Sequence, residues 1–246
     1  MVITGNTLID CEVGVNIRYC EDAIVSNNTI RAFASGIHLY RVVKGISMTG
    51  NVIRGSEFGF RLDTINDAAS FTGPLTFANN DVTATKPVYI YAPILDCNAE
   101  IYVDDNRLGG CDDYGVHVQV GTDSGGGFSG SVSRNSVAGV SDVYSRGYAY
   151  RLVNGRKLKV LDNSADGNSV AFSRIVRFEG AQTSEIVERG TLAIGTAASV
   201  ALVDLAAGTA TRLGSLEDRP LVVTGDTTCD HRNIYINNKA GSACVF

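Results

Sequence analysis

The sequence predicts an all-β protein built from stacked coils, and three observations lead to this prediction. A short phrase with an asparagine at a fixed place recurs along the chain, and a second phrase of alternating apolar residues follows it. The third observation is the composition: of 246 residues, 27 are Gly, only 4 are Pro and none is Trp, whereas Tyr and Phe number 10 and 9. Such a composition favours many short strands joined by turns over helices.

The first phrase is ITGNTL at residues 3–8, and it returns as VSNNTI at 25–30, MTGNVI at 48–53 and FANNDV at 77–82. Its asparagine recurs at intervals of 22 to 29 residues and defines a register: Asn6, Asn28, Asn51, Asn80, Asn106, Asn135 and Asn163. The residues three places before and two places after each Asn are apolar, so both are expected to point inward. Asn tolerates left-handed backbone at turns, and its amide both donates and accepts hydrogen bonds. We therefore predict a structural asparagine ladder along one turn.

The second phrase follows about eight residues after each asparagine and reads Gly-apolar-x-apolar. It occurs as GVNI at 14–17, GIHL at 36–39, GFRL at 59–62 and GVHV at 115–118, with PVYI at 87–90 and AYRL at 149–152 as variants without Gly. Alternation with a period of two indicates a strand with one buried and one exposed face. Because one repeat is too small to bury its own apolar face, the coils must stack on one another.

Both phrases in this order resemble the coils of the right-handed parallel β-helix of the pectate-lyase-like superfamily. The resemblance covers residues 1 to about 180 and implies a right-handed parallel β-helix of about seven coils at 1–180. From 181 the register is lost, and segments such as TLAIG, PLVVTG and NIYINN alternate between turns. We expect a small antiparallel β region at 181–246, a C-terminal cap or oligomerisation region, with a continued irregular β-helix as the alternative. The superfamily hosts many activities, so the fold alone assigns none.

Charge and cysteine usage exclude several classes of partner. The net charge of −5 and the absence of a Lys/Arg run argue against nucleic acid or an anionic membrane as partner. No apolar run is long enough for membrane insertion, and the N-terminus lacks the features of a signal peptide. The six cysteines lack metal-site spacing, so we expect buried thiols, no metal and no cofactor. Only Cys229 and Cys244 look placed to meet across a hairpin.

The outward x position of the second phrase defines a candidate binding face. Along the stack it reads Asn16, His38, Arg61, Tyr89, His117 and Arg151, and two residues further on come Arg18, Tyr40, Asp63, Tyr91 and Gln119. Aromatic planes stack on sugar rings, and Arg and His bind hydroxyls or carboxylates. We predict substrate binding by the following residues: His38, Tyr40, Arg61, Tyr89, Tyr91 and His117. Insertions at about 63–74 and 119–130 would flank this face. The alternative is an exposed polar face without a ligand.

Carboxylates supply the candidates for catalysis. Glu57 and Asp113 each lie two residues before the Gly of the second phrase, two coils apart, which predicts a separation of about 10 Å. This is near the upper limit, about 9.5 Å, for a pair that hydrolyses a glycosidic bond with inversion. Asp63 is a third candidate. The alternative is that these acids are solvated groups at coil corners.

The segment at 103–118, VDDNRLGGCDDYGVHV, faintly resembles the Asp/His/Tyr sites of alginate-type epimerases and lyases. The Asp-Pro-His motif of the epimerases and the Trp-x-Asp-His and Arg-x-Pro-x-x-Arg motifs of pectate lyases are absent from the sequence. If the protein is an enzyme, a glycoside hydrolase is therefore favoured over a lyase.

A β-helix with an uncapped first coil, a β-rich C-terminal region and unpaired cysteines is similar to the distal part of a bacteriophage tailspike. That resemblance implies a homotrimer of the virion tail that binds, and often cleaves, bacterial surface polysaccharide outside the cell. Met1 is followed at once by a full repeat, so we expect the N-terminal end to stack on another segment or protein. The alternatives are a free polysaccharide lyase or epimerase and a non-enzymatic fibre or adhesin module.

Overall fold

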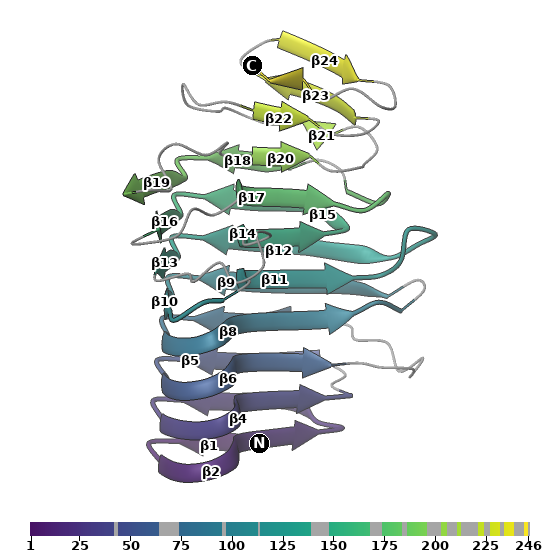
Figure 1. Ribbon diagram of the computed structural model, residues 1–246. Coiled ribbons are helices and arrows are strands. Elements are labelled where there is room, and N and C mark those ends of the chain that lie inside the picture. The colour runs from purple at the N-terminus through teal and green to yellow at the C-terminus, as the bar shows by residue number, and fades with distance from the viewer. Residues whose placement is uncertain are drawn as a thin grey trace.

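The protein is a parallel β-helix, as predicted, in which successive coils stack along one axis (Figure 1). The computed structural model describes residues 1–41, 44–63, 74–94, 97–112, 114–138, 148–167, 174–183, 186–195, 203–205, 211–212, 221–223, 227–231, 234–238 and 244–245.

One sheet takes one short strand from each coil, all in parallel. Its strands, in spatial order, are β1 (Val2–Thr4), β3 (Glu21–Ser26), β5 (Lys44–Thr49), β7 (Pro74–Ala78), β9 (Asn98–Asp104), β12 (Gly127–Ser133), β15 (Gly155–Leu161) and β18 (Val187–Arg189). The order follows the sequence because each coil adds its strand beside that of the coil before it.

The second sheet begins with four long strands that pair in parallel along their length: β2 (Thr7–Arg18), β4 (Thr29–Tyr40), β6 (Val52–Asp63) and β8 (Asp81–Ala92). In later coils the same path is divided into two strands. These pairs are β10 (Arg107–Gly109) with β11 (Tyr114–Val120), β13 (Ser136–Ala138) with β14 (Tyr148–Val153), β16 (Ser164–Gly167) with β17 (Arg174–Glu179), and β19 (Leu192–Gly195) with β20 (Val203–Leu205). In these later coils, the short strand follows the ladder asparagine and the longer strand lies where the earlier coils carry the second phrase.

The predicted inward positions form the core. From the second coil to the seventh, the residues three places before and two places after each ladder asparagine are buried: Val25, Ile30, Met48, Ile53, Phe77, Val82, Val103, Leu108, Val132, Val137, Val160 and Ala165. In the first coil, Ile3 and Leu8 are only partly buried. Continuous apolar columns of this kind let each coil bury the face that it cannot bury alone.

The asparagine ladder is confirmed. In the second coil, Asn28 donates from its backbone N–H and its Nδ2 to the Oδ1 of Asn51, at 3.1 and 3.0 Å, and Nδ2 also donates to the carbonyl of Ile3. The pattern repeats up to Asn163, which leaves each buried amide satisfied. By register Thr191 takes the next place, so the ladder ends there.

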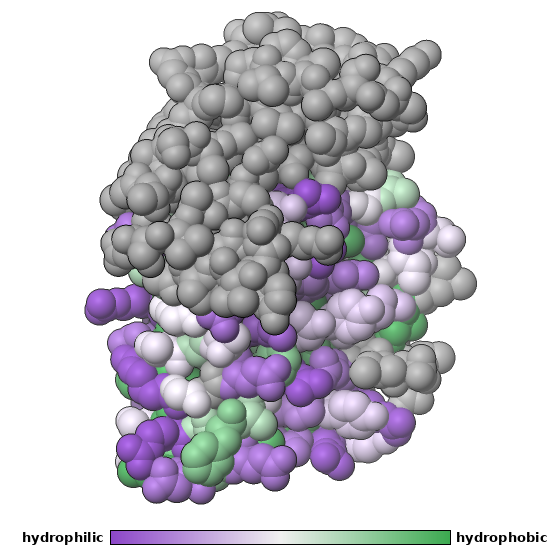
Figure 2. Space-filling model, in the orientation of Figure 1, coloured by the Kyte–Doolittle hydropathy of each residue, from purple (hydrophilic) through white to green (hydrophobic). Residues whose placement is uncertain are grey.

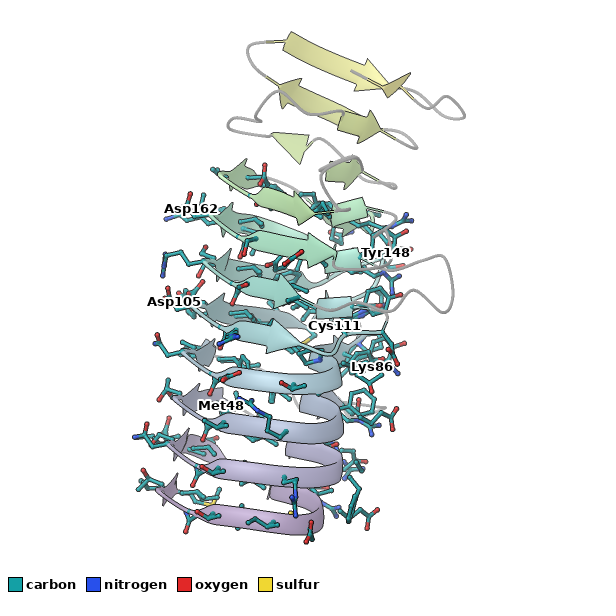
Figure 3. All side chains as sticks on the ribbon, turned by 60° about the vertical axis from the view of Figure 1, so that its left-hand side comes forward. Met48, Lys86, Asp105, Cys111, Tyr148 and Asp162 are labelled. Carbon is teal, nitrogen blue, oxygen red and sulfur yellow. The ribbon has the colours of Figure 1, made fainter. Side chains whose placement is uncertain are left out.

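The left-handed backbone lies one residue earlier than predicted. At each turn of the ladder, the residue with positive φ is the one just before the asparagine: Gly5, Asn27, Gly50, Asn79, Asp105, Arg134 and Asp162. The asparagines themselves use their amides for the ladder. Figure 3 shows Asp105 and Asp162 projecting from this edge of the stack, while Lys86 and Tyr148 lie at the opposite edge.

The glycine of the second phrase is explained by the approach of the next coil. A Cβ on Gly59 would lie 2.3 Å from Val82 Cγ1 and 2.6 Å from the carbonyl oxygen of Pro87, and similar close contacts surround Gly14, Gly36 and Gly115. No side chain fits there without a shift, because backbone and a core residue occupy the space.

Parallel pairing continues past residue 181, where we expected the register to end: β18, β19 and β20 add to the sheets, and β22 (Leu221–Val223) pairs in parallel with β20. Among the described strands, antiparallel pairing is found between β22 and β25 (Cys244–Val245) and between β23 (Thr227–His231) and β24 (Ile234–Asn238), with β21 (Thr211–Arg212) parallel to β23. Cys229 pairs with Ile236 and Cys244 with Val223, so the two cysteines are not opposite each other in a hairpin. Within the described residues, no helix has the length and apolar character needed to cross a membrane.

Candidate functional site

The two predicted outward columns are in register. Asn16, His38, Arg61, Tyr89, His117, Arg151 and Arg177 pair in turn along one column. Arg18, Tyr40, Asp63, Tyr91, Gln119, Val153 and Glu179 form the second. All six predicted substrate-binding residues therefore lie on one side of the sheet formed by β4, β6, β8 and β11.

A third column, three residues before the first, was missed from the sequence although the same register contains it. It includes Phe58, Lys86, Tyr114 and Tyr148, which pair along β6, β8, β11 and β14. We call the three columns together the aromatic face, defined as His38, Tyr40, Phe58, Arg61, Asp63, Lys86, Tyr89, Tyr91, Tyr114, His117, Tyr148, Arg151, Arg177 and Glu179.

Aromatic rings run along this face from coil to coil without a break. Tyr89 is the centre: its ring centroid lies 5.3 Å from that of Phe58, 6.0 Å from that of Tyr91 and 5.0 Å from that of His117. The Tyr114 ring meets His117 edge-on at 5.0 Å. These separations are within the range of favourable aromatic pairs.

The chain of rings then continues upward, because the Tyr148 ring is stacked on that of Tyr114 at 6.1 Å with an interplanar angle of 4°. Tyr89, Tyr91, Tyr114 and Tyr148 are half-buried, so part of each side chain reaches the surface.

His117 and Asp63 do not match the expectation of an exposed face. His117 is only 3% exposed and Asp63 only 5%, because neighbouring side chains cover them. Neither ring nitrogen of His117 has a hydrogen-bond partner among the described residues. Burial, together with the nearby charge of Arg151, lowers the pKa of His117 to about 3, so the imidazole is neutral at physiological pH. His117 therefore acts as part of the packing beneath the tyrosines rather than as a surface group.

Two cations contact the Phe58 ring at the lower end of this row of rings. The Arg61 guanidinium is 4.5 Å from the centroid of Phe58, and Lys86 Nζ is 5.0 Å from the same ring. Arg61 also forms an ion pair with Asp63, whose carboxylate is 3.6 Å from Nε2 of His38. Arg61 is thus fixed by a ring on one side and a buried carboxylate on the other.

A second cluster of charged side chains, Arg151, Arg177 and Glu179, lies at the upper end of the aromatic face. Arg151 donates two hydrogen bonds to Glu179, at 3.1 and 2.7 Å, and Arg177 pairs with the same carboxylate. Arg177 also donates to the Tyr148 hydroxyl at 2.7 Å. Burial alone would raise the pKa of Glu179, but Arg151 and Arg177 outweigh it and lower the pKa, so Glu179 stays ionised. Sequence reasoning missed Arg177 and Glu179 because the second phrase has no obvious copy at 174–179.

The predicted catalytic carboxylates are not brought together as a described pair. Glu57 has an exposed side chain 3.7 Å from Lys86 Nζ, whereas Asp63 is buried against Arg61. Asp113 lies outside the described residues, so its separation from Glu57 stays a prediction. The predicted insertion at about 63–74 also lies almost entirely outside the described residues, because 64–73 are not described. The predicted insertion at about 119–130 is described. It forms a tight turn at residues 121–126, closed by a bridge from Thr122 to Gly125.

Metal-ligating side chains are not gathered within the described residues, where no group of three or more His, Cys, Asp and Glu could hold an ion. Cys97 and Cys111 are buried, and Cys11 and Cys20 are partly buried, all four as free thiols. Burial raises the pKa of Cys111 to about 12, which keeps it protonated.

Comparison with known families supports the fold. Residues 1–93 match the family model described as periplasmic copper-binding protein (NosD), a family of right-handed β-helices in the pectate-lyase-like superfamily. Searches of curated proteins and of solved structures gave no match.

The matched residues of this chain do not fit a copper site. They include one histidine, His38, whose described charged neighbour is Asp63, and two cysteines, Cys11 and Cys20. Copper sites gather several imidazole or sulfur ligands around one ion, and no such cluster exists among the described residues.

Proposed function

We propose that the protein binds a bacterial surface polysaccharide along the aromatic face, in the manner of a tailspike-type receptor-binding protein. The observation that carries the proposal is the unbroken series of half-exposed tyrosines in neighbouring coils, held between arginine–carboxylate pairs. Tyrosine rings offer apolar planes to the faces of sugar rings, and a tyrosine hydroxyl can both donate and accept hydrogen bonds.

The repeat of the fold suits a polymeric ligand. Successive coils present equivalent side chains at about 4.8 Å intervals, so a chain lying along the stack meets the same kinds of groups again and again. Two tyrosines in different coils have an arginine beside them: the Arg18 guanidinium lies 5.6 Å from the centroid of the Tyr40 ring, and Arg177 donates to the Tyr148 hydroxyl. Arginine donors that are already fixed in place lose little conformational entropy when they bind hydroxyls or carboxylates of a glycan.

Binding is proposed in preference to cleavage. Asp63 is held in its ion pair with Arg61, and Glu57 is exposed beside Lys86, so the two described carboxylates are each engaged by a cation and do not form a catalytic pair. The assembly as a homotrimer of a virion tail remains part of the proposal. Analytical ultracentrifugation tests it, because a monomer at micromolar concentration would contradict a tailspike assembly.

Titration calorimetry with purified capsular polysaccharides and O-antigen chains tests the binding face. Tyr91→Ala should weaken binding about tenfold, since it removes a stacking plane worth about 1.5 kcal/mol. Tyr102→Ala is the matched control, because Tyr102 lies in β9 of the other sheet. Equal affinity of both variants, or no binding by any polysaccharide, would contradict the proposal.

The same mixtures decide between binding and cleavage. New reducing ends would indicate hydrolysis, and unsaturated sugars would indicate a lyase. If cleavage occurs, Glu57→Gln and Asp113→Asn should abolish it, and unchanged cleavage in both variants would exclude this carboxylate pair.

A further inference from the structure

A second groove lies beside the aromatic face and extends from it over the strands β10, β13 and β16. It consists of two hollows of about 440 and 370 Å³ that share Thr83. The first is lined by Phe33, Gly55, Glu57, Thr83, Ala84, Thr85 and Gly110. The second is lined by Arg54, Asp81, Val82, Thr83, Arg107, Leu108, Gly109, Ser136, Ala138, Ser164 and Asp166. None of these residues belongs to the aromatic face.

The first hollow pairs an apolar plane with polar groups. Phe33 is 68% exposed, so its ring leaves a large apolar surface in contact with water. The floor beside it is low, because Gly55, Ala84 and Gly110 have little or no side chain. The Glu57 carboxylate, held near Lys86, lies on the rim. An exposed ring beside a carboxylate and threonine hydroxyls is the chemistry that binds a sugar ring by its face and its hydroxyls.

The second hollow continues the groove over later coils. In the column that starts at Asp81, the register gives Arg107, then Ser136, then Ser164. In the neighbouring column, Thr83 pairs with Gly109 and Gly109 with Ala138. The small side chains at Gly109 and Ala138 leave a depression in the surface. Polar groups stand along this floor at intervals of one coil, which suits an elongated ligand.

Charge in the groove is nearly balanced. Arg54 forms an ion pair with Asp81 at 2.6 Å, and Glu57 is paired with Lys86. Arg107 has no ion pair among the described residues, and Asp166 lines the far end of the same hollow. On the side of the molecule seen in Figure 2, the coloured surface of the lower coils mixes hydrophilic side chains with weakly apolar ones. A strongly anionic ligand would meet both Glu57 and Asp166, so the groove favours an uncharged one.

We propose that this groove is a second saccharide site, which binds a neutral oligosaccharide with one sugar ring stacked on Phe33 and further hydroxyls bonded to Thr83, Arg107 and Ser136. The site is separate from the aromatic face and does not depend on the function proposed for that face. Two glycan sites on one β-helix would let the protein hold a branched or folded polymer at two points.

Ligand-observed saturation-transfer NMR and calorimetry test this site with maltohexaose, cellohexaose and isomaltohexaose, and with hexagalacturonate as an anionic probe. At least one neutral hexamer should bind. Phe33→Ala should weaken that binding about tenfold, as expected for loss of a buried aromatic contact. Ser136→Trp, at an exposed position, should abolish it by filling the second hollow.

Two controls separate this site from the rest of the surface. Ile9→Ala removes another exposed apolar side chain outside the groove and should leave the affinity unchanged. Tyr91→Ala, on the aromatic face, should also leave it unchanged. The proposal is overturned if no neutral hexamer binds, if Phe33→Ala and Ser136→Trp bind like the parent protein, if Tyr91→Ala alone abolishes binding, or if hexagalacturonate binds more tightly than the neutral hexamers.

Discussion

Truncation of one ladder asparagine should show how much of the stability depends on the ladder. The Nδ2 of Asn51 donates to the carbonyl of Val25 at 2.9 Å and to Oδ1 of Asn80 at 3.0 Å. Its Oδ1 accepts from the backbone N–H and from Nδ2 of Asn28, at 3.1 and 3.0 Å. Asn51→Ala removes all four bonds and leaves the Asn28 N–H without this buried partner. At about 1–3 kcal/mol for each buried group left unsatisfied, the loss should be about 3 kcal/mol.

Asn6→Ala is the matched control, because Asn6 begins the ladder, is exposed and accepts no bond from an earlier asparagine. We expect it to cost about 0.5 kcal/mol, as for a solvated hydrogen bond. Urea unfolding followed by circular dichroism gives both free energies of unfolding. Amide exchange shows whether the loss is confined to the neighbouring coils, as nearest-neighbour coupling in a stacked protein predicts. If Asn51→Ala costs no more than Asn6→Ala, the ladder does not contribute in the way its hydrogen bonds suggest.

Three further predictions concern packing and protonation. Gly59→Ala should destabilise the protein by about 2–3 kcal/mol in urea unfolding because the next coil fills the space of its Cβ, whereas Gly55→Ala, with positive φ but open space, should cost about 1 kcal/mol. Burial lowers the pKa of His117 from 6.5 to about 3, so the unfolded chain binds the extra proton between these values, and the stability present above pH 6.5 is lost as the pH falls towards 3. His117→Leu should remove about 3 kcal/mol of that loss, measured from urea midpoints at pH 4 and pH 7.5 against the parent protein; an unchanged difference would contradict it. Mass spectrometry after thiol labelling should find Cys20 modified and Cys111 unmodified in the folded protein, and equal labelling would contradict the burial of Cys111.

Most of the fold could be predicted because one register carries it. The recurrence of Asn6, Asn28 and Asn51 fixes which residues of each coil are equivalent, and stacking in a parallel sheet then forces equivalent residues to be neighbours. The same reasoning placed His38 next to Arg61 and Tyr89 next to His117, although these residues are more than 20 positions apart in the chain.

Burial on the outer side could not be predicted from that register. The alternation of apolar and polar residues predicts that the His117 side chain points away from the core of the β-helix. It does not predict whether neighbouring side chains cover His117 on the outer surface. Tyr89 and Tyr114 cover the imidazole from two sides, and Tyr114 lies in a column three residues away that the period of two does not include. The misplaced left-handed residue has a similar cause: Asn suits both positions of the turn, and only the hydrogen bonds show which of Asn27 and Asn28 is in the ladder.

The bend of each coil separates groups that are close in sequence. Glu57 and Asp63 belong to one strand, β6, yet Glu57 lines the second groove while Asp63 is buried on the aromatic face. The chain turns at the left-handed Gly55, where the register shifts between Arg54 and Ser56, so Glu57 lies directly after the bend, whereas Asp63 lies at the end of the strand, six residues further on. Column position therefore identifies neighbours along the stack, but it does not tell which column belongs to which face. This protein therefore has two chemically distinct outer surfaces on one core. The aromatic face has its own small buried cluster around His117, whereas the groove beside it leaves the Phe33 ring exposed to solvent.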